Sequence, residues 1–152
     1  MEENKIEFFD GITKEDFEQI LSKYRGSIEN RNELVKEARK GVEPEAFLAV
    51  AALSGYRKQQ IAEILDVSLK TMMRYKQEQK KLNPGNSELI LKLIGLFKKG
   101  EELFGDLHSF KRWLEYPAYG LGNQVPYNLL NLSTGIDLIL DELSRIEHGD
   151  LA

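Results

Sequence analysis

The sequence predicts an all-α protein in which a helix-turn-helix module is followed by a second helical module. Apolar residues recur three and four positions apart through most of the 152 residues, which is the spacing of helices with one buried face. No segment shows the alternation of a half-buried strand. The segment 60–75, QIAEILDVSLKTMMRY, has the spacing of two short helices joined by a sharp turn.

Composition indicates the setting. The chain has no cysteine, which excludes disulfides and thiolate metal sites and makes a reducing cytoplasm the expected location. The acidic start, MEENKIEFFD, lacks the apolar run of a secretory signal. No stretch approaches the roughly 20 apolar residues of a membrane span, so we expect no membrane partner.

The net charge of −4 is unevenly distributed. Residues 1–35 carry five Lys and Arg against nine Asp and Glu, residues 36–100 thirteen against seven, and residues 101–152 three against nine. The only net basic part therefore contains the helix-turn-helix. A chain divided in this way can bind nucleic acid with its middle and another partner with its ends.

Three helices are predicted before the helix-turn-helix. Residues 13–24 form the first, with a threonine N-cap, and Gly26 is expected to end it. Residues 30–40 form a weaker one that Gly41 stops. Residues 44–55 form a third, which begins at a proline and ends at a glycine.

The helix-turn-helix itself has a recognisable apolar pattern. Ile61, Ala62 and Leu65 share one face of its first helix. Asp66 stands in the turn where glycine is commoner, and aspartate tolerates the left-handed conformation better than most residues. Ser68 can cap the second helix through its hydroxyl.

The second helix is the predicted recognition helix. With Met72 and Tyr75 turned inward, its outer face carries side chains that can reach phosphates and base edges. The predicted DNA-binding residues are Ser68, Lys70, Thr71, Arg74, Lys76 and Gln77. The helix is expected to continue past Lys80 and Lys81 toward a turn at residues 83–85. The alternative interpretation, a purely structural αα-corner, gives no reason for this polar and basic face.

A strongly apolar helix is predicted after the turn, with Ser87 as its N-cap and Phe104-Gly105 at its end. Its apolar residues are Leu89, Ile90, Leu93, Ile94, Leu96 and Phe97. So much apolar surface predicts a helix buried between modules or in a dimer. Shorter helices are predicted around Trp113 and from Pro126, and residues 134–147 form the last helix, which Gly149 caps.

Three stretches of the second half carry a family resemblance: LFKKGEELFGDLHSFKRWL, YGLGNQVPYNLL and TGIDLILDELSRIEHG. Residues 87–152 resemble the toxin-binding domain of Xre/MbcA/ParS-type antitoxins. The matching positions are Phe104-Gly105, Trp113-Leu114, Leu121-Gly122, Pro126, Leu129-Leu130, Gly135, Arg145-Ile146-Glu147 and Gly149. The helix-turn-helix, with Thr71 and Arg74, is similar to the Xre half of the same proteins. One departure is that residues 116–120, YPAYG, replace the commoner Asn-Pro before Leu-Gly.

The resemblance implies an N-terminal Xre/Cro-like helix-turn-helix domain followed by a helical toxin-binding domain. Residues 1–35 are then an N-terminal extension, residues 36–86 the DNA-binding domain and residues 87–152 the toxin-binding domain. It implies the antitoxin of a bacterial type II toxin–antitoxin system whose partner is a RES-domain toxin, an enzyme that depletes NAD. In this family the antitoxin is a dimer, its C-terminal module blocks the toxin's active-site cleft, and the complex binds operator DNA to repress its own operon.

The end of the last helix is where we expect the toxin to bind. The predicted toxin-binding residues are Arg145, Glu147, His148, Gly149, Asp150, Leu151 and Ala152. Asp150 and the terminal carboxylate would place negative charge beside Leu151, a combination that suits a cleft built for an anionic dinucleotide. Arg145 and Glu147 have the alternative interpretation of solvated charges.

Two other functions are weighed against this one. A stand-alone helix-turn-helix transcriptional regulator with a C-terminal ligand- or protein-sensing module is the main alternative. An enzyme acting on nucleotides is disfavoured because Gly120-Leu121-Gly122 lacks the third glycine and preceding strand of a dinucleotide loop. His108 and His148 have no nucleophile motif or metal-ligand spacing around them. We therefore expect no catalytic residue, cofactor or metal.

Overall fold

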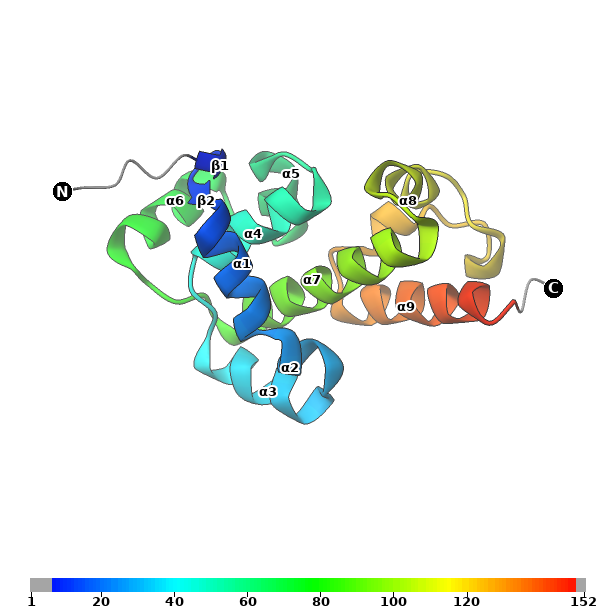
Figure 1. Ribbon diagram of the computed structural model, residues 1–152, viewed down its shortest axis with the longest axis horizontal. Coiled ribbons are helices and arrows are strands. Elements are labelled where there is room, and N and C mark those ends of the chain that lie inside the picture. The colour runs from blue at the N-terminus through cyan, green and yellow to red at the C-terminus, as the bar shows by residue number, and fades with distance from the viewer. Residues whose placement is uncertain (1–6, 150–152) are drawn as a thin grey trace. The chain divides into compact units, whose positions relative to one another are not determined.

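The structure is a computed structural model that describes residues 7–149 (Figure 1). This part of the chain is mostly helical, which confirms the predicted all-α class. The chain divides into two compact units, residues 1–94 and 95–152. Among the described residues, no helix is long and apolar enough to cross a membrane.

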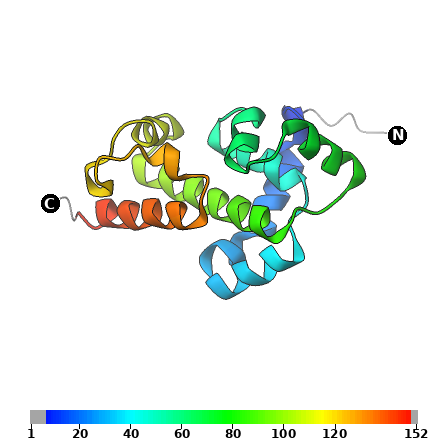
Figure 2. The same cartoon turned by 180° about the vertical axis from the view of Figure 1, so that it is seen from behind.

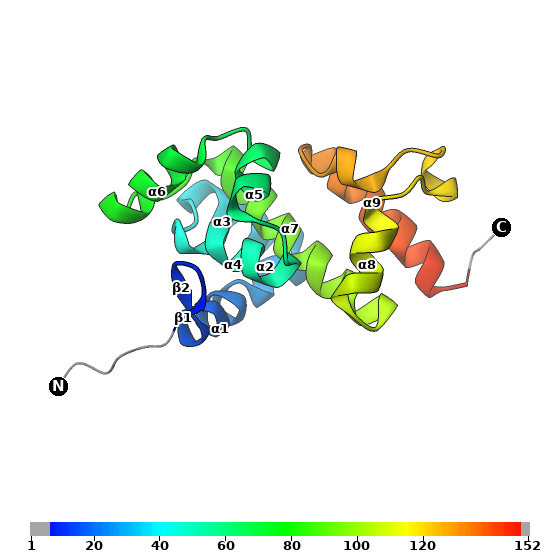
Figure 3. The same cartoon turned by 90° about the horizontal axis from the view of Figure 1, so that it is seen from above.

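The first unit begins with a hairpin that the sequence did not predict. Strand β1 (Glu7–Phe9) pairs antiparallel with β2 (Ile12–Thr13). Strands of three and two residues are too short for an alternating pattern to show. The hairpin lies against the start of α1 (Lys14–Lys23) (Figure 3).

The first unit continues with five helices, α2 (Arg25–Glu29), α3 (Arg31–Lys40), α4 (Glu45–Ser54), α5 (Lys58–Ile64) and α6 (Leu69–Glu78), which precede a longer helix that begins within it. Helices α2 and α3 pack side by side (Figure 2). The Thr13 cap is confirmed, since its hydroxyl accepts from the Asp16 N–H at 3.1 Å. Gly41 ends α3 in a positive-φ conformation, as expected. Gly26, however, does not end α1, because α1 stops before Tyr24 and Gly26 lies inside α2.

Helix α4 forms the centre of this unit. Every residue from Ala46 to Ala51 is buried, so the helix has almost no solvent-facing side. Tyr24, Ile61 and Met72, from α1's C-cap, α5 and α6, are fully buried in the same unit. Ala52, which follows this run, is only half-buried.

The long helix α7 (Pro84–Phe104) begins earlier than expected. Asn83 caps it by accepting from the Asn86 N–H at 2.8 Å, and Pro84 suits the first helical position because its missing N–H needs no partner there. The stretch predicted as a turn is therefore a helix start. Ser87 is not the cap; its buried hydroxyl accepts from the Val42 N–H at 3.0 Å and donates to the Leu82 carbonyl.

The apolar run of α7 is covered within one chain. Ile90, Leu93, Ile94, Leu96 and Phe97 are all fully buried. The run therefore needs no second chain to cover it, so of the two predicted alternatives, burial between modules or in a dimer, the structure does not require the dimer. Helical periodicity identifies an apolar surface but not the surface that covers it.

The second unit continues with α8 (Leu107–Leu114), the 3-10 turns η1 (Tyr119–Leu121) and η2 (Pro126–Leu129), and α9 (Ser133–Glu147). Phe110 of α8 is fully buried and meets Phe97 edge-on, with ring centroids 5.5 Å apart. Gly100 lies against the same ring, where a Cβ atom would come within 2.2 Å of Phe110 Cε2. Gly100 thus allows the Phe110 ring to pack closely against α7.

We predict that Gly100→Ala destabilises the protein by about 1–3 kcal/mol, the usual cost of overpacking a core. Helix propensity alone would make alanine more stabilising than glycine by about 1 kcal/mol. A decrease in the free energy of unfolding would therefore come from the clash with Phe110. Denaturant unfolding measures it. Gly26→Ala is the matched control, because nothing lies within 4 Å of a Cβ at that helical position. Equal stability of the two variants would contradict the packing role.

Candidate functional site

Helices α5 and α6 form the corner that the sequence predicted. Asp66 has a φ of 55° in the turn, so it does adopt the left-handed conformation. The Ser68 hydroxyl accepts from the Thr71 N–H at 3.0 Å and caps α6. Ile61 and Leu65 are buried, and Met72 is buried opposite the outer face of α6.

The six predicted DNA-binding residues divide into three groups. Lys70, Arg74 and Gln77 are exposed and, at positions i, i+4 and i+7, share one face of α6. Ser68 and Thr71 lie at the helix start, where the Ser68 hydroxyl donates to the Thr71 hydroxyl at 2.8 Å. The outer face and the N-terminal end of α6 therefore form one continuous polar surface.

Lys76 points elsewhere. It lies four residues after buried Met72, and its ammonium donates to the Gly11 carbonyl in the hairpin at 2.8 Å. The spacing from Met72 would have indicated this direction from the sequence, but no pattern indicated the hairpin that receives it. Gly11 also has a φ of 93°, which favours glycine at this turn.

Asp10, next to Gly11 in the hairpin, pairs with a second lysine, and this contact was not predicted from the sequence. Lys58, the first residue of α5, lies with its Nζ 2.6 Å from Asp10 Oδ2. This hydrogen bond lowers the pKa of Asp10 from its ordinary value. Residues Asp10 and Gly11 thus contact one lysine from each helix of the helix-turn-helix.

Helix α6 ends at Glu78, sooner than predicted. Gln79 follows with a φ of 54°, and its side chain donates to Glu45 at the start of α4 at 3.0 Å. Lys80 and Lys81 therefore lie beyond the helix, not on its continuation. Lys80 turns back over the Tyr75 ring, with its ammonium 4.7 Å from the ring centroid.

A second cluster lies where α9 meets the η1 turn. Glu142 is buried, and the Arg145 Nε donates to its carboxylate at 3.0 Å while a terminal nitrogen also bonds it. The same terminal nitrogen donates to the Gly120 carbonyl at 3.3 Å. Arg145, predicted as a toxin contact, therefore also joins α9 to η1. Sequence analysis missed Glu142, whose spacing of three from Arg145 and place in the apolar stripe were visible.

The other predicted residues at this end have simpler contacts. Glu147 lies 3.7 Å from the Lys99 ammonium. His148 is exposed, and its Nδ1 is 2.7 Å from the Ser144 carbonyl. Gly149 follows the helix with a φ of 75°. Asp150, Leu151 and Ala152 lie outside the described residues.

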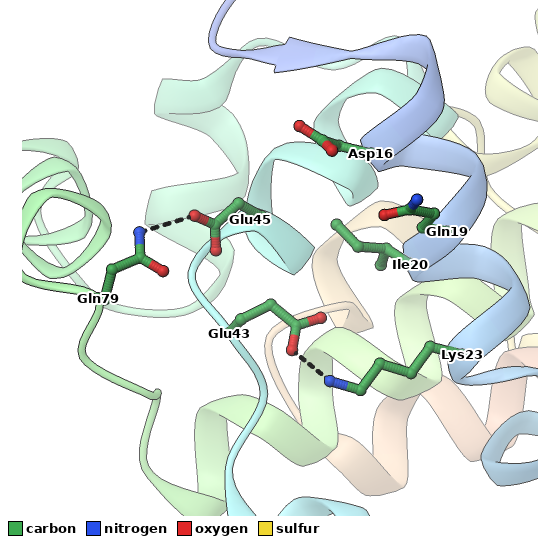
Figure 4. A pocket seen from close by; sticks show the side chains of 7 residues that line it. All are labelled: Asp16, Gln19, Ile20, Lys23, Glu43, Glu45 and Gln79. Atoms are coloured by element: carbon green, nitrogen blue, oxygen red, sulfur yellow. Dashed lines mark hydrogen bonds and ion pairs between the residues drawn. The ribbon is translucent and has the colours of Figure 1, made fainter.

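A pocket of about 350 Å³ opens in the first unit (Figure 4). It is lined by Asp16, Gln19, Ile20, Lys23, Glu43, Glu45 and Gln79. Glu43 accepts from the Lys23 ammonium at 2.9 Å and from the Tyr24 hydroxyl at 2.8 Å. Burial, with Glu43 beside it, raises the pKa of Tyr24, so this hydroxyl stays protonated and donates. Two of the four lining charges, Lys23 and Glu43, therefore pair with each other, and Glu45 accepts from Gln79.

Over residues 7–149, no group of three or more His, Asp or Glu side chains could hold a metal ion. The clusters that the structure does contain are ion pairs and caps. They can fix a surface for a macromolecule.

Two family models match the chain. The antitoxin Xre-like helix-turn-helix domain matches residues 33–95, and the antitoxin Xre/MbcA/ParS C-terminal toxin-binding domain matches residues 99–149. The chain is 25% identical to a protein named Antitoxin Xre from Yersinia enterocolitica over 117 residues, which are 76% of this chain and 79% of that protein. It is 26% identical to Antitoxin Xre from Photorhabdus laumondii over 97 residues, 63% of this chain and 66% of that protein.

Proposed function

The chain belongs to the Xre-type antitoxins, with an Xre-like helix-turn-helix domain followed by a C-terminal toxin-binding domain, and we propose from this that it neutralises a RES-domain toxin. The toxin would be an NAD-depleting enzyme in the same cytoplasm, and the antitoxin would bind operator DNA to repress its own operon. The observation that carries the proposal is the presence of both matched domains, in this order, on one chain. The chain itself would act by binding and carry out no catalysis.

The DNA-binding role rests on the outer face of α6. Lys70, Arg74 and Gln77 supply cations and an amide on one face, and arginine is the side chain that most often reads guanine in the major groove. Segment 36–100 has thirteen Lys and Arg against seven Asp and Glu, so the module attracts phosphate although the whole chain is acidic.

The toxin-binding role rests on the second unit and its charge. Residues 101–152 carry three Lys and Arg against nine Asp and Glu. A cleft that binds the pyrophosphate of NAD needs positive charge, and complementary charge speeds and orients the encounter. We place the chain end, residues 148–152, in or across that cleft, with Asp150 meeting a cation and Leu151 an apolar wall.

Co-expression with the product of the adjacent gene tests the whole proposal. The antitoxin should restore growth, preserve cellular NAD and co-purify with the toxin. Release from DNA by a small ligand, with no protein partner, would instead favour a stand-alone regulator.

We predict that Arg74→Ala weakens specific operator binding by about 1–3 kcal/mol, because a bidentate contact to a base would be lost. Gel-shift titrations against operator and scrambled DNA measure it. Arg39→Ala removes the same charge from an exposed position on α3 and is the matched control. If the ratio of operator to scrambled affinity stays unchanged, α6 is not the recognition helix. Toxin neutralisation should be intact in both variants.

We predict a homodimer, because operator reading by this fold uses two half-sites about 34 Å apart. Light scattering at micromolar concentration should give twice the chain mass of 17.5 kDa. With the α7 run buried, the exposed face of α9 around Leu138 is the better candidate for the interface. Leu138→Lys should then shift the mass toward the monomer. A wild-type species of 17.5 kDa alone would refute the dimer.

We predict that deleting residues 148–152 abolishes protection from the toxin and spares DNA binding and the fold. Among the deleted residues that the structure describes, His148 and Gly149 are both exposed, so the core keeps its contacts. Survival after toxin induction measures protection, and circular dichroism and gel shifts serve as controls. Survival equal to that of the wild type would show that neutralisation does not use the chain end.

A further inference from the structure

The η1 turn of the second unit exposes an aromatic side chain. Tyr119 is 81% exposed, the most of any large hydrophobic side chain among the described residues, and Tyr116, three residues earlier, is 64% exposed. A tyrosine so exposed gains little from folding through burial of its own ring. An exposed ring of this kind is therefore better suited to contact with a partner than to stabilising the fold.

The backbone around Tyr119 is closely fixed. The Ala118 N–H donates to the Gln124 carbonyl at 2.9 Å, and the Asn123 N–H donates to the Ala118 carbonyl at 3.0 Å. Leu121 is buried directly beneath the turn. Gly122 reverses the chain with a φ of 65°, a conformation that glycine adopts without strain because it has no side chain. The turn thus presents Tyr119 from a fixed backbone.

Helix α9 supports the turn from the other side. A Cβ atom on Gly120 would come within 2.1 Å of the Glu142 carboxylate, so the turn and the helix are in direct contact at this point. Arg145 bonds both Glu142 and the Gly120 carbonyl. The residue next to Tyr119 is therefore held by an ion pair on α9.

We propose that Tyr119 is an aromatic anchor for the toxin, and that Arg145 positions it through Gly120. The inference rests on the proposed function and names a contact within it. Tyrosine on a rigid support is a typical hot-spot residue, since its large ring is buried on binding with little loss of conformational entropy.

Position and charge identify the toxin as the occupant of this surface. Arg145 contacts the turn from the last helical turns of α9, after which the chain continues into the residues proposed to enter the cleft. The surrounding segment, residues 101–152, is acidic, with three Lys and Arg against nine Asp and Glu. The matching toxin surface would be an apolar pocket with a basic rim.

Tyr119→Ala tests the anchor in the full-length protein. Binding of purified toxin, measured by calorimetry, should weaken about 10-fold or more, while operator binding and the melting temperature stay unchanged. Tyr119→Phe should bind nearly as the wild type, because the ring carries the contact. Leu132→Ala is the matched control, since Leu132 is 59% exposed but lies at the opposite end of α9.

The outcomes distinguish failure of the Tyr119 anchor from failure of the proposed function. Wild-type antitoxin that fails to bind the toxin overturns the proposed function and the anchor together. Wild-type binding that Tyr119→Ala leaves unchanged overturns the anchor alone. Equal losses for Tyr119→Ala and Leu132→Ala would also overturn it, because the loss would then not be specific to the turn.

The positioning role of Arg145 has its own readout. If Arg145 acts through the turn, Arg145→Ala weakens toxin binding in the wild type and adds little in the Tyr119→Ala background. Additive losses would mean that Arg145 contacts the toxin independently, which overturns the positioning role. Arg145→Lys, which keeps the charge and loses the paired donors, should lie between the wild type and Arg145→Ala.

Discussion

The burial of α4 is the constraint on which the first unit depends. Six consecutive residues, Ala46 to Ala51, are shielded from solvent, and a helix that is apolar all round must be surrounded on every side. Helix α1, the hairpin and α5 all contact it. Because α5 is seated on α4, the corner at Asp66 then determines the direction in which α6 leaves the core.

The proposed DNA-binding surface of α6 follows from this arrangement. Once Met72 is buried, positions 70, 74 and 77 must face solvent, and position 76 must face back across the unit. Lys76 meets the hairpin carbonyl of Gly11 there, and Asp10 pairs with Lys58 on α5. The matched helix-turn-helix domain starts at residue 33. The hairpin residues Asp10 and Gly11 precede it and contact both α5 and α6.

Much of this could be predicted from sequence, since it depends on local rules. Apolar periodicity identified the corner and the buried sides of most helices, and the caps at Thr13 and Ser68 were predicted and are confirmed. The predictions fail where residues distant in sequence determine a hydrogen bond or cover an apolar surface. Ser87 seemed a cap, but its hydroxyl bonds Val42, 45 positions away. The apolar run of α7 left open burial between modules or in a dimer, because which surface covers a helix is not encoded in its own pattern.

The second unit shows the same limit at its glycines. Gly100 and Gly120 do not have the positive φ that marks Gly122 as a turn residue. They are required because the Phe110 ring and the Glu142 carboxylate approach their Cα atoms too closely for a side chain. Such close approaches join segments far apart in sequence, so composition and spacing could not have distinguished these glycines from flexible ones.

The buried carboxylate of Glu142 explains how Arg145 can pair with a carboxylate and hold the η1 turn at the same time. A buried charge left unpaired costs several kcal/mol, about 3–5 in measured cases, so Glu142 requires its arginine in the free antitoxin. Yet a guanidinium has five N–H donors, and the bonds to Glu142 and Gly120 use only Nε and one terminal nitrogen. The Arg145 side chain is still 51% exposed. Although the side chain is exposed, its contacts with Glu142 and Gly120 fix the η1 turn before a partner arrives, so binding through the turn would carry little additional entropic cost.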